Sequence, residues 1–568
     1  MTLEPLKRAL HWLQAGPLAY DAVQPLHRDD PTFRAVHRAA LALLAVFVAL
    51  GAALIVSGVI DNKPTTASTG LVTVHRQVTQ NWSGWFAEGV WWRNQQTPTP
   101  LPFTIHGLFF TIFGYSVRGI LILHTLAGAG AAWLLFRITA RRFGAPAGLL
   151  SMGLCVAAPL FLYVTFAGWT FVWATLFLLL AIDLTDRAAP EGNVRLFLLA
   201  GLAVGCAGMS RPENYATAAL FVLFAPFKIR HRAAFLLLAF AYPLAQTLLN
   251  NFLWGDAPGL RILDDARSTM SYPALFLEWS GSVRRNILNQ NFAPHFQWAL
   301  VPAFLCFGLP RHRLLAGILA YFCVAFFAAY AMRRISFNHE GYYFAHVVLC
   351  MPFLAAALYW LAGRVMALLR RLHCPPRAAR PAAAAVILVL VAANMASLHA
   401  AYAARLFYRV PEPVQELRDF LVARLEVGDT VVLDYFAEVS WMLAELEGEG
   451  EGGRHIYYYN TNPTGIPRPR LNAIRKDLGD GEIGQVNAWV GENLRAWTAA
   501  RAADYVVMLS DAAWERETTR KNATGHYRMF GLRPALAVLG DGAPLAGLDA
   551  RGVIFENGEF VVYAGGQR

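Results

Sequence analysis

The sequence is short of charge, and this shortage restricts what the protein can be. Only 15% of its 568 residues are Asp, Glu, Lys or Arg, whereas 56% are hydrophobic. Apolar stretches of about 20 residues recur along the chain, which is typical of a polytopic membrane protein. The net charge of +11 does not indicate nucleic-acid binding, because Lys and Arg cluster at the ends of the apolar stretches, where they set membrane orientation.

Several other features are absent. The chain has six cysteines, but none falls in a predicted outer segment, so no disulfide framework is expected, and none has the spacing of metal ligands. No glycine-rich phosphate motif and no internal repeat occur. Nothing resembles a cleavable signal peptide, so the first apolar stretch, Val36 to Ile60, is expected to stay as a membrane anchor.

The apolar stretches predict a polytopic α-helical membrane domain over residues 36–401, after a cytoplasmic amphipathic segment, 1–35. Eleven spans are expected, at residues 36–60, 116–136, 147–165, 169–183, 196–209, 214–227, 233–253, 296–310, 314–332, 343–363 and 381–400. Lys and Arg concentrate in the connections that this arrangement places inside. Eleven spans put the C-terminus outside, in the periplasm of a bacterial cell, since the Ala/Arg/Leu-rich composition is typical of a GC-rich bacterial genome.

Residues 402–568 change pattern and predict a C-terminal α/β soluble domain on the outer face. Strand-like runs lie at 430–433, 456–459, 505–508, 553–555 and 560–563, and helical stretches lie at 439–446 and 484–501. Alternating strands and helices are typical of a layered α/β fold.

The most informative segment is the first outer loop, 61–115. It ends in a proline-rich stretch, 97–102, followed by the apolar run Phe103 to Phe113. As a helix this run is about 16 Å long, too short to cross a hydrocarbon core of about 30 Å. We therefore expect it to lie along the membrane surface, where it would help to form a site for a lipid-anchored substrate.

The first loop supplies candidate catalytic and sugar-binding residues. Its acids are Asp61, at the mouth of the first span, and Glu88, within an aromatic segment. Trp85 and Trp92 are suited to stack on a sugar or to lie in the headgroup layer, and both interpretations stay open. Arg93 is grouped with them as a sugar- or acceptor-binding candidate.

Two outer turns supply candidate phosphate ligands. Arg211 is placed to grip a phosphate at headgroup depth, with Glu213 as its orienting partner and a further sugar- or acceptor-binding candidate. Arg333 and Arg334 depart from the positive-inside trend, and with Tyr342 they are candidates for the same donor phosphate. The alternative for the first turn is a local ion pair between Arg211 and Glu213 at the surface, and for the second turn it is polar side chains that only keep the turn in water.

Other polar residues give weaker indications. His339 is a candidate for sugar or acceptor binding, whereas His75, His106 and His346 stand singly and are interpreted as structural or interfacial. The pair Asp264-Asp265 resembles a metal site but lacks a third ligand nearby. The pair leaves a divalent cation as a candidate cofactor, but its lack of a third ligand means that no metal ligand is assigned.

The motifs resemble those of lipid-dependent glycosyltransferases of the GT-C superfamily, in particular protein O-mannosyltransferases and bacterial aminoarabinose transferases. The similarity covers roughly residues 36–360. The segments that carry it are Pro100-Leu101 before the apolar run, Ile112-Phe113-Gly114, Arg141-Arg142-Phe143-Gly144, Ala157-Ala158-Pro159, Arg211-Pro212-Glu213, and Tyr342-Tyr343 with Met351-Pro352.

This resemblance implies an inverting transferase that takes a sugar from a polyprenyl-phosphate donor and passes it to a lipid, glycan or protein acceptor. A first-loop carboxylate would serve as general base, and basic residues would hold the donor phosphate. The sequence departs from the family at three points: residues 71–78 carry no acid, Thr99 stands where a lysine is common, and the stretch 168–171 has no acidic residue. The base is therefore expected to be Asp61 or Glu88.

Two alternatives stay open. One is a ligase or polymerase of lipid-linked glycans, for which Arg261, Arg267, Arg284 and Arg285 leave room. The other is a non-catalytic scaffold that binds polyprenyl phosphate, which the absence of an acid from residues 71–78 favours. A secondary transporter is disfavoured, because no inverted repeat occurs and few ionisable residues lie within the predicted spans.

Overall fold

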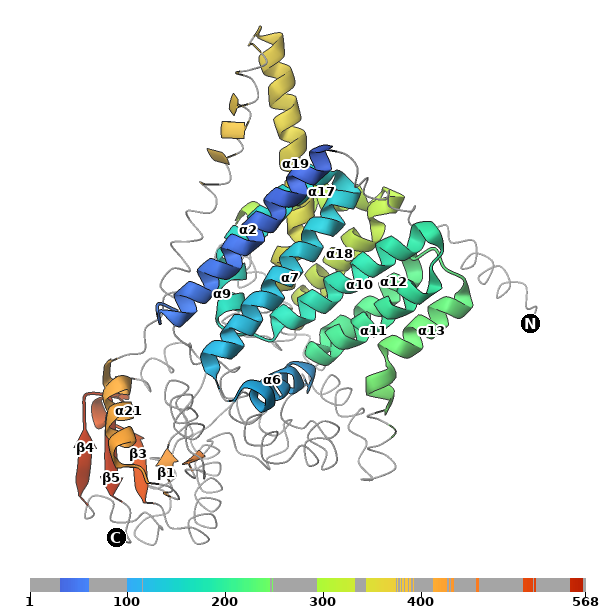
Figure 1. The fold of residues 1–568 in the computed structure, drawn as a ribbon. Coiled ribbons are helices and arrows are strands. Elements are labelled where there is room, and N and C mark those ends of the chain that lie inside the picture. The colour runs from blue at the N-terminus through green and yellow to red at the C-terminus, as the bar shows by residue number, and fades with distance from the viewer. Residues whose placement is uncertain are drawn as a thin grey trace.

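The computed structural model describes residues 31–60, 100–114, 116–245, 294–331, 344–373, 412–426, 504–513 and 552–564, with short stretches at 431–433 and 456–458 and scattered positions elsewhere. These residues form a body of long helices and a five-stranded sheet with one helix packed on it (Figure 1). The mostly helical architecture expected from the apolar stretches is confirmed.

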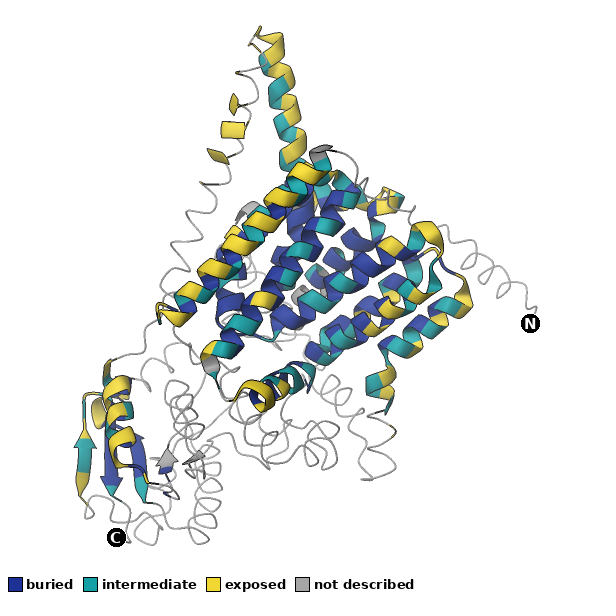
Figure 2. Ribbon diagram, viewed as in Figure 1, coloured by how far each residue is buried: buried dark blue, intermediate teal, exposed yellow. Residues whose placement is uncertain are grey.

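The helical body is centred on α7. Its helices are α2 (Pro31–Val56), α6 (Pro100–Phe113), α7 (Val117–Phe143), α8 (Ala145–Ala157), α9 (Pro159–Phe166), α10 (Phe171–Glu191), α11 (Val194–Ser210), α12 (Thr217–Phe224), α13 (Ile229–Ala239), α17 (Pro294–Phe307), α18 (Arg313–Ala331) and α19 (Phe344–Arg371), with 3-10 turns η2 (Pro212–Ala216) and η4 (Pro310–His312). Helix α7 packs against α2, α8 and α10, and α10 packs against α11. Figure 2 shows α7 and α10 largely buried, whereas α2 exposes one face.

Local sequence sets where these helices begin and end. The hydroxyl of Ser116 accepts a hydrogen bond from the Gly119 amide at 3.0 Å and caps the start of α7. Gly192 caps the C-terminus of α10, and its φ of 60° lies in the left-handed region that glycine adopts without strain. The side chain of Asn193 then accepts from the Leu196 amide and caps α11. The chain therefore reverses between two packed helices within two residues.

The predicted span over residues 147–165 is not a single straight helix. The chain forms two helices there, α8 and α9, which meet at an angle of 61°. The break falls at Ala158, in extended conformation before Pro159, because a residue that precedes proline is driven out of the helical region. Helices α10 and α19 extend beyond the predicted spans 169–183 and 343–363, to Glu191 and Arg371.

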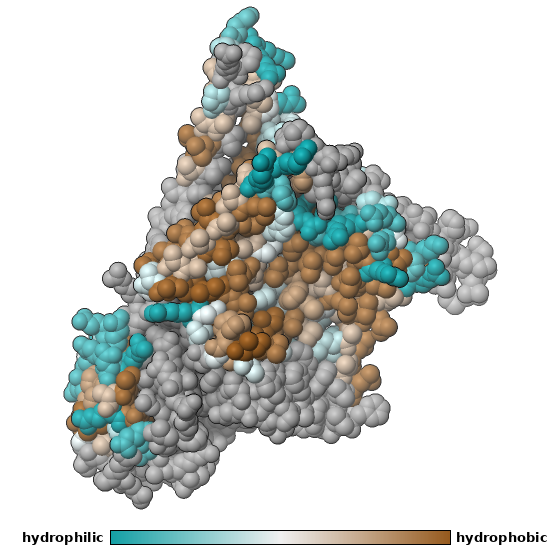
Figure 3. Space-filling view, in the orientation of Figure 1, coloured by the Kyte–Doolittle hydropathy of each residue, from teal (hydrophilic) through white to brown (hydrophobic). Residues whose placement is uncertain are grey.

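Among the described residues, three helices are long and apolar enough to cross a membrane: Phe33–Val56, Arg118–Phe143 and Phe344–Arg371. The bent pair α8–α9 makes a fourth if its two halves form one span. Figure 3 shows apolar side chains gathered in a band across the helical body, with hydrophilic ones along its upper edge. The number of spans, eleven, stays a prediction.

The helix expected after the proline-rich stretch is present as α6, which has 14 residues. It packs against α11 and lies across one end of the helical body (Figure 1). We call this the α6 end, and the end that carries Arg141 and Arg142 the arginine-rich end.

The C-terminal sheet has the order β2-β1-β3-β5-β4. Its strands are β1 (Val431–Leu433), β2 (Ile456–Tyr458), β3 (Tyr505–Leu509), β4 (Val553–Glu556) and β5 (Phe560–Ala564). The first three pair in parallel and the last two are antiparallel. All five predicted strands are confirmed, whereas the predicted helices 439–446 and 484–501 lie outside the described residues. Helix α21 (Glu412–Arg424), which the sequence analysis missed, buries Val414, Leu417 and Leu421 against the sheet.

Candidate functional site

Of the residues predicted to act on substrate, Arg211 and Glu213 belong to the described part of the chain. The others lie outside it: Asp61, Trp85, Glu88, Trp92, Arg93, Arg333, Arg334, His339 and Tyr342. Their roles stay predictions. The site is therefore built from Arg211 outward.

Arg211 stands at the exit of α11, in a turn that hydrogen bonds hold from several sides. Its backbone is extended, with φ −156°, and Pro212 opens the 3-10 turn η2 directly after it. The buried Asn214 donates from Nδ2 to the Arg211 carbonyl at 3.0 Å. The hydroxyl of Thr217 donates to the Asn214 carbonyl at 2.6 Å. These hydrogen bonds fix the conformation of residues 211–217, which we call the Arg211 turn.

The Arg211 guanidinium is held on two sides. Its Nε donates to Oε1 of Glu213 at 3.0 Å, and its Cζ lies 3.9 Å from the centre of the Phe171 ring, at the start of α10. The Arg211 side chain is 14% exposed and that of Glu213 is 36% exposed. A guanidinium fixed by a carboxylate and an aromatic face, yet still reachable, is suited to bind a phosphate.

Two tyrosines position the Arg211 turn against neighbouring helices. The Tyr321 hydroxyl, from α18, donates to the Glu213 carbonyl at 2.7 Å. The ring of Tyr215 lies against Gly208 of α11 so closely that a Cβ there would come within 2.3 Å of it. Any side chain at Gly208 would therefore displace Tyr215 and the turn that carries it.

We expect Tyr321→Phe to lower the free energy of unfolding by about 1 kcal/mol, because the Glu213 carbonyl loses its hydrogen bond from α18. Thermal unfolding of the purified protein in detergent measures this loss. Tyr359→Phe is the matched control, since Tyr359 is 52% exposed. Equal unfolding midpoints for the Tyr321 and Tyr359 variants would contradict the assigned contact.

A second polar cluster connects α6 to the helical body. His106 of α6 and His124 of α7 are both buried, and their Nε2 atoms lie 2.8 Å apart. Trp173 of α10 donates from Nε1 to Nε2 of His124 at 3.4 Å. The interpretation of His106 as a single histidine is corrected, because it is paired with a residue 18 positions away that the sequence analysis did not mark.

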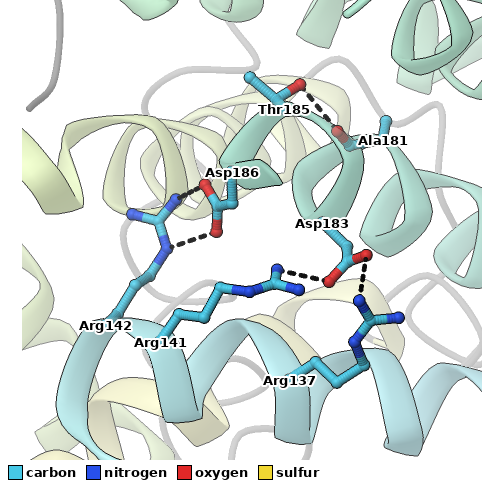
Figure 4. Close-up of polar contacts among 7 residues, drawn as sticks. All are labelled: Arg137, Arg141, Arg142, Ala181, Asp183, Thr185 and Asp186. Carbon is cyan, nitrogen blue, oxygen red and sulfur yellow. Dashed lines mark hydrogen bonds and ion pairs between the residues drawn. The ribbon is translucent and has the colours of Figure 1, made fainter. Parts of the chain in front are cut away.

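A network of buried ion pairs closes the arginine-rich end (Figure 4). Arg142 makes a two-pronged contact with Asp186, from Nε to Oδ2 at 3.1 Å and from Nη2 to Oδ1 at 2.5 Å, and also donates to the Arg311 carbonyl. Asp183 is bound by Arg141 at 2.6 Å and by Arg137 at 3.3 Å. These contacts join α7 to α10 and η4. The carboxylates of Asp183 and Asp186 are therefore occupied by structural ion pairs.

The described residues contain no group of three or more His, Cys, Asp or Glu side chains arranged to hold a metal ion. The pair Asp264-Asp265 and the acids of the first loop lie outside the described residues. A divalent cation therefore stays a prediction.

Comparison with known proteins bears on the fold. Residues 97–249, which include α6, His106, His124, Phe171 and the Arg211 turn, match the model of the dolichyl-phosphate-mannose-protein mannosyltransferase family. No curated protein matches the chain.

Solved structures of the same fold are known. ArnT from Cupriavidus metallidurans in the apo state has a TM-score of 0.52 and 14% identity, with 93% of this chain and 98% of that chain covered. ArnT from the same organism bound to undecaprenyl phosphate has a TM-score of 0.50 and 13% identity, with 92% and 98% covered. The predicted resemblance to GT-C glycosyltransferases is thereby confirmed at the level of the fold.

Proposed function

We propose that this chain, which has the fold of the GT-C glycosyltransferases, moves a sugar from a polyprenyl-phosphate donor to a lipid, glycan or protein acceptor. The reaction would take place at the outer face of a bacterial cytoplasmic membrane. The fold and the family match support a glycosyltransferase in general. The donor class, the face and the residue roles are our proposal.

The Arg211 turn is the observation that carries this proposal. A phosphate donor needs a cation held at a fixed place, and the Arg211 guanidinium is held by Glu213 and by the Phe171 ring. The family match spans the turn, and a protein with the same fold was crystallised with undecaprenyl phosphate. We assign Glu213 to orienting Arg211, since its carboxylate already accepts a hydrogen bond from the Nε–H of Arg211.

The proposed reaction is a single in-line displacement. Asp61 or Glu88 removes the proton of the acceptor hydroxyl, whose oxygen attacks the anomeric carbon of the sugar. The bond from that carbon to the donor phosphate oxygen breaks, and the polyprenyl phosphate leaves with the bonding electrons. Arg211, with Arg333, Arg334 and Tyr342, would bind the developing negative charge. Trp85, Trp92, Arg93 and His339 would contact the sugar or the acceptor.

The charge distribution supports an orientation with the α6 end outside. Charged side chains gather at the other end of the helical body, including Arg137, Arg141, Arg142, Arg187, Arg195, Arg311 and Arg313. Arginine-rich ends face the cytoplasm in membrane proteins. The sheet also lies beyond the α6 end (Figure 1), which agrees with a periplasmic C-terminal domain.

The assignment of the base is tested with purified protein and a panel of polyprenyl-phosphate and nucleotide-linked sugars. We expect release of free polyprenyl phosphate from at least one lipid donor. Asp61→Ala or Glu88→Ala, whichever removes the base, should lower the release rate by about 10²- to 10⁴-fold. Glu191→Ala is the matched control, because Glu191 is an exposed acid at the arginine-rich end.

Three other results would change the proposal. Full activity in both acid variants would show that neither residue is the base. Release from lipid-linked oligosaccharides alone would favour a ligase or polymerase. Tight lipid binding without release from any donor would favour a non-catalytic scaffold.

A further inference from the structure

His106 of α6 and His124 of α7 form a buried, hydrogen-bonded imidazole pair, which packing between apolar helices does not require. His106 is 1% exposed and His124 is fully buried. Burying two imidazoles costs free energy unless they are hydrogen-bonded, and a phenylalanine pair would fill similar space without that cost. The pair therefore fixes the position of α6 relative to α7 more specifically than hydrophobic contact would.

The neighbour of the pair determines where its protons lie. The indole Nε1 of Trp173 is a donor only, and it points at Nε2 of His124. We therefore assign that nitrogen as the acceptor, which places the proton shared by the two imidazoles on Nε2 of His106. Two N–H groups, from α6 and α10, thus converge on one nitrogen of α7.

The first turn of α10, which carries Trp173, also contacts the Arg211 turn through Phe171. Trp173 bonds to His124, and Phe171, two residues earlier, carries the Arg211 guanidinium on its ring. A continuous set of contacts therefore runs from α6 through α7 and α10 to Arg211. Any shift of α6 that breaks the imidazole bond changes the support of Trp173 and, through the same helical turn, that of Phe171.

The His106–His124 pair lies in surroundings that favour uncharged imidazoles. Helix α6 has no charged side chain, and the carboxylates of α10 that the structure describes, Asp183, Asp186 and Glu191, lie towards its other end. Burial lowers the pKa of His106 to about 3. The imidazole is therefore neutral near pH 7, and the contact needs no proton uptake to form.

We propose that His106 and His124 form a positioning pair that couples the placement of α6 to that of the Arg211 turn. Because α6 begins at Pro100, where the first loop ends in the sequence, the pair also fixes the position of Pro100 relative to the Arg211 turn. The proposal rests on the proposed function only for the identity of the ligand; the coupling itself is a property of the fold.

The test compares two substitutions of His106 in the full-length protein. Leucine removes the hydrogen bond, whereas glutamine keeps an N–H donor for His124. In His106→Leu we expect backbone hydrogen exchange to rise about 10- to 100-fold in both residues 100–113 and residues 211–217, as a buried hydrogen bond is lost. In His106→Gln we expect exchange within about threefold of the unsubstituted protein. Leu108→Ala is the control, because Leu108 is 49% exposed on the same helix.

Turnover provides a second readout. In His106→Leu, kcat for polyprenyl phosphate release should fall about 10- to 100-fold, and His106→Gln should restore it, because a misplaced helix disturbs alignment of the reacting groups. Unchanged exchange at residues 211–217 in His106→Leu would overturn the coupling. If the unsubstituted protein releases no lipid phosphate, the proposed function fails, whereas the exchange comparison still decides the coupling.

Discussion

Replacing Arg211 with alanine is expected to lower turnover with a polyprenyl-phosphate sugar by about 10²- to 10³-fold, the cost of removing one preorganised group from a developing anion. The guanidinium is held by Glu213 and Phe171 before any ligand arrives, so little reorganisation is needed when the phosphate departs. Arg211→Lys keeps the charge but loses the planar contact with Phe171 and the Nε bond, so we expect an intermediate rate. Steady-state release of polyprenyl phosphate measures all three rates.

The matched control is Arg118→Ala, because Arg118 is an exposed arginine at the N-terminus of α7, which like Arg211 lies at the α6 end. It should change the rate by no more than about threefold. A folded Arg211→Ala protein with the rate of the Arg118 variant would show that Arg211 does not bind the leaving phosphate.

The second large effect is expected on stability, at the arginine-rich end. Asp186→Asn should lower the free energy of unfolding by about 3–5 kcal/mol, because the fully buried Arg142 side chain loses the partner of its charge. Replacing both residues, as Arg142→Met with Asp186→Leu, should restore most of that loss, since an apolar pair leaves no buried charge. Denaturant unfolding in detergent measures each change.

Arg187→Ala is the control for this series, because Arg187 is the next residue of α10 and is exposed. It should change the free energy of unfolding by less than about 0.5 kcal/mol. A loss below about 1 kcal/mol in Asp186→Asn would mean that the Arg142–Asp186 pair is solvated in solution and does not join α7 to α10.

Much of the fold followed from short-range patterns in the sequence. The length of the apolar run after the prolines predicted α6, and the runs of β-branched and aromatic residues predicted all five strands. The kink between α8 and α9 was missed because apolar composition alone cannot distinguish a straight span from a broken one. Pro159 carried the signal, since proline restricts the residue before it.

The site was predictable only where its residues are neighbours in the chain. Arg211 and Glu213 lie two positions apart, so their pairing was inferred from the turn. His106 and His124 are 18 residues apart, and Arg142 and Asp186 are 44 apart. Contacts of this kind depend on how helices pack, which the sequence of a single helix does not specify. Arg142 was accordingly interpreted only as an orientation signal and as part of a family motif, although it is also a buried structural residue.

The central claim is that a polyprenyl phosphate binds at the α6 end, against the Arg211 turn. The most direct measurement is photo-crosslinking of the purified protein with a diazirine analogue of undecaprenyl phosphate, followed by peptide mass spectrometry. We predict crosslinks within residues 100–113, 169–173 and 208–217 that excess undecaprenyl phosphate suppresses. Crosslinks confined to the arginine-rich end, or crosslinks that excess lipid does not suppress, would contradict the account.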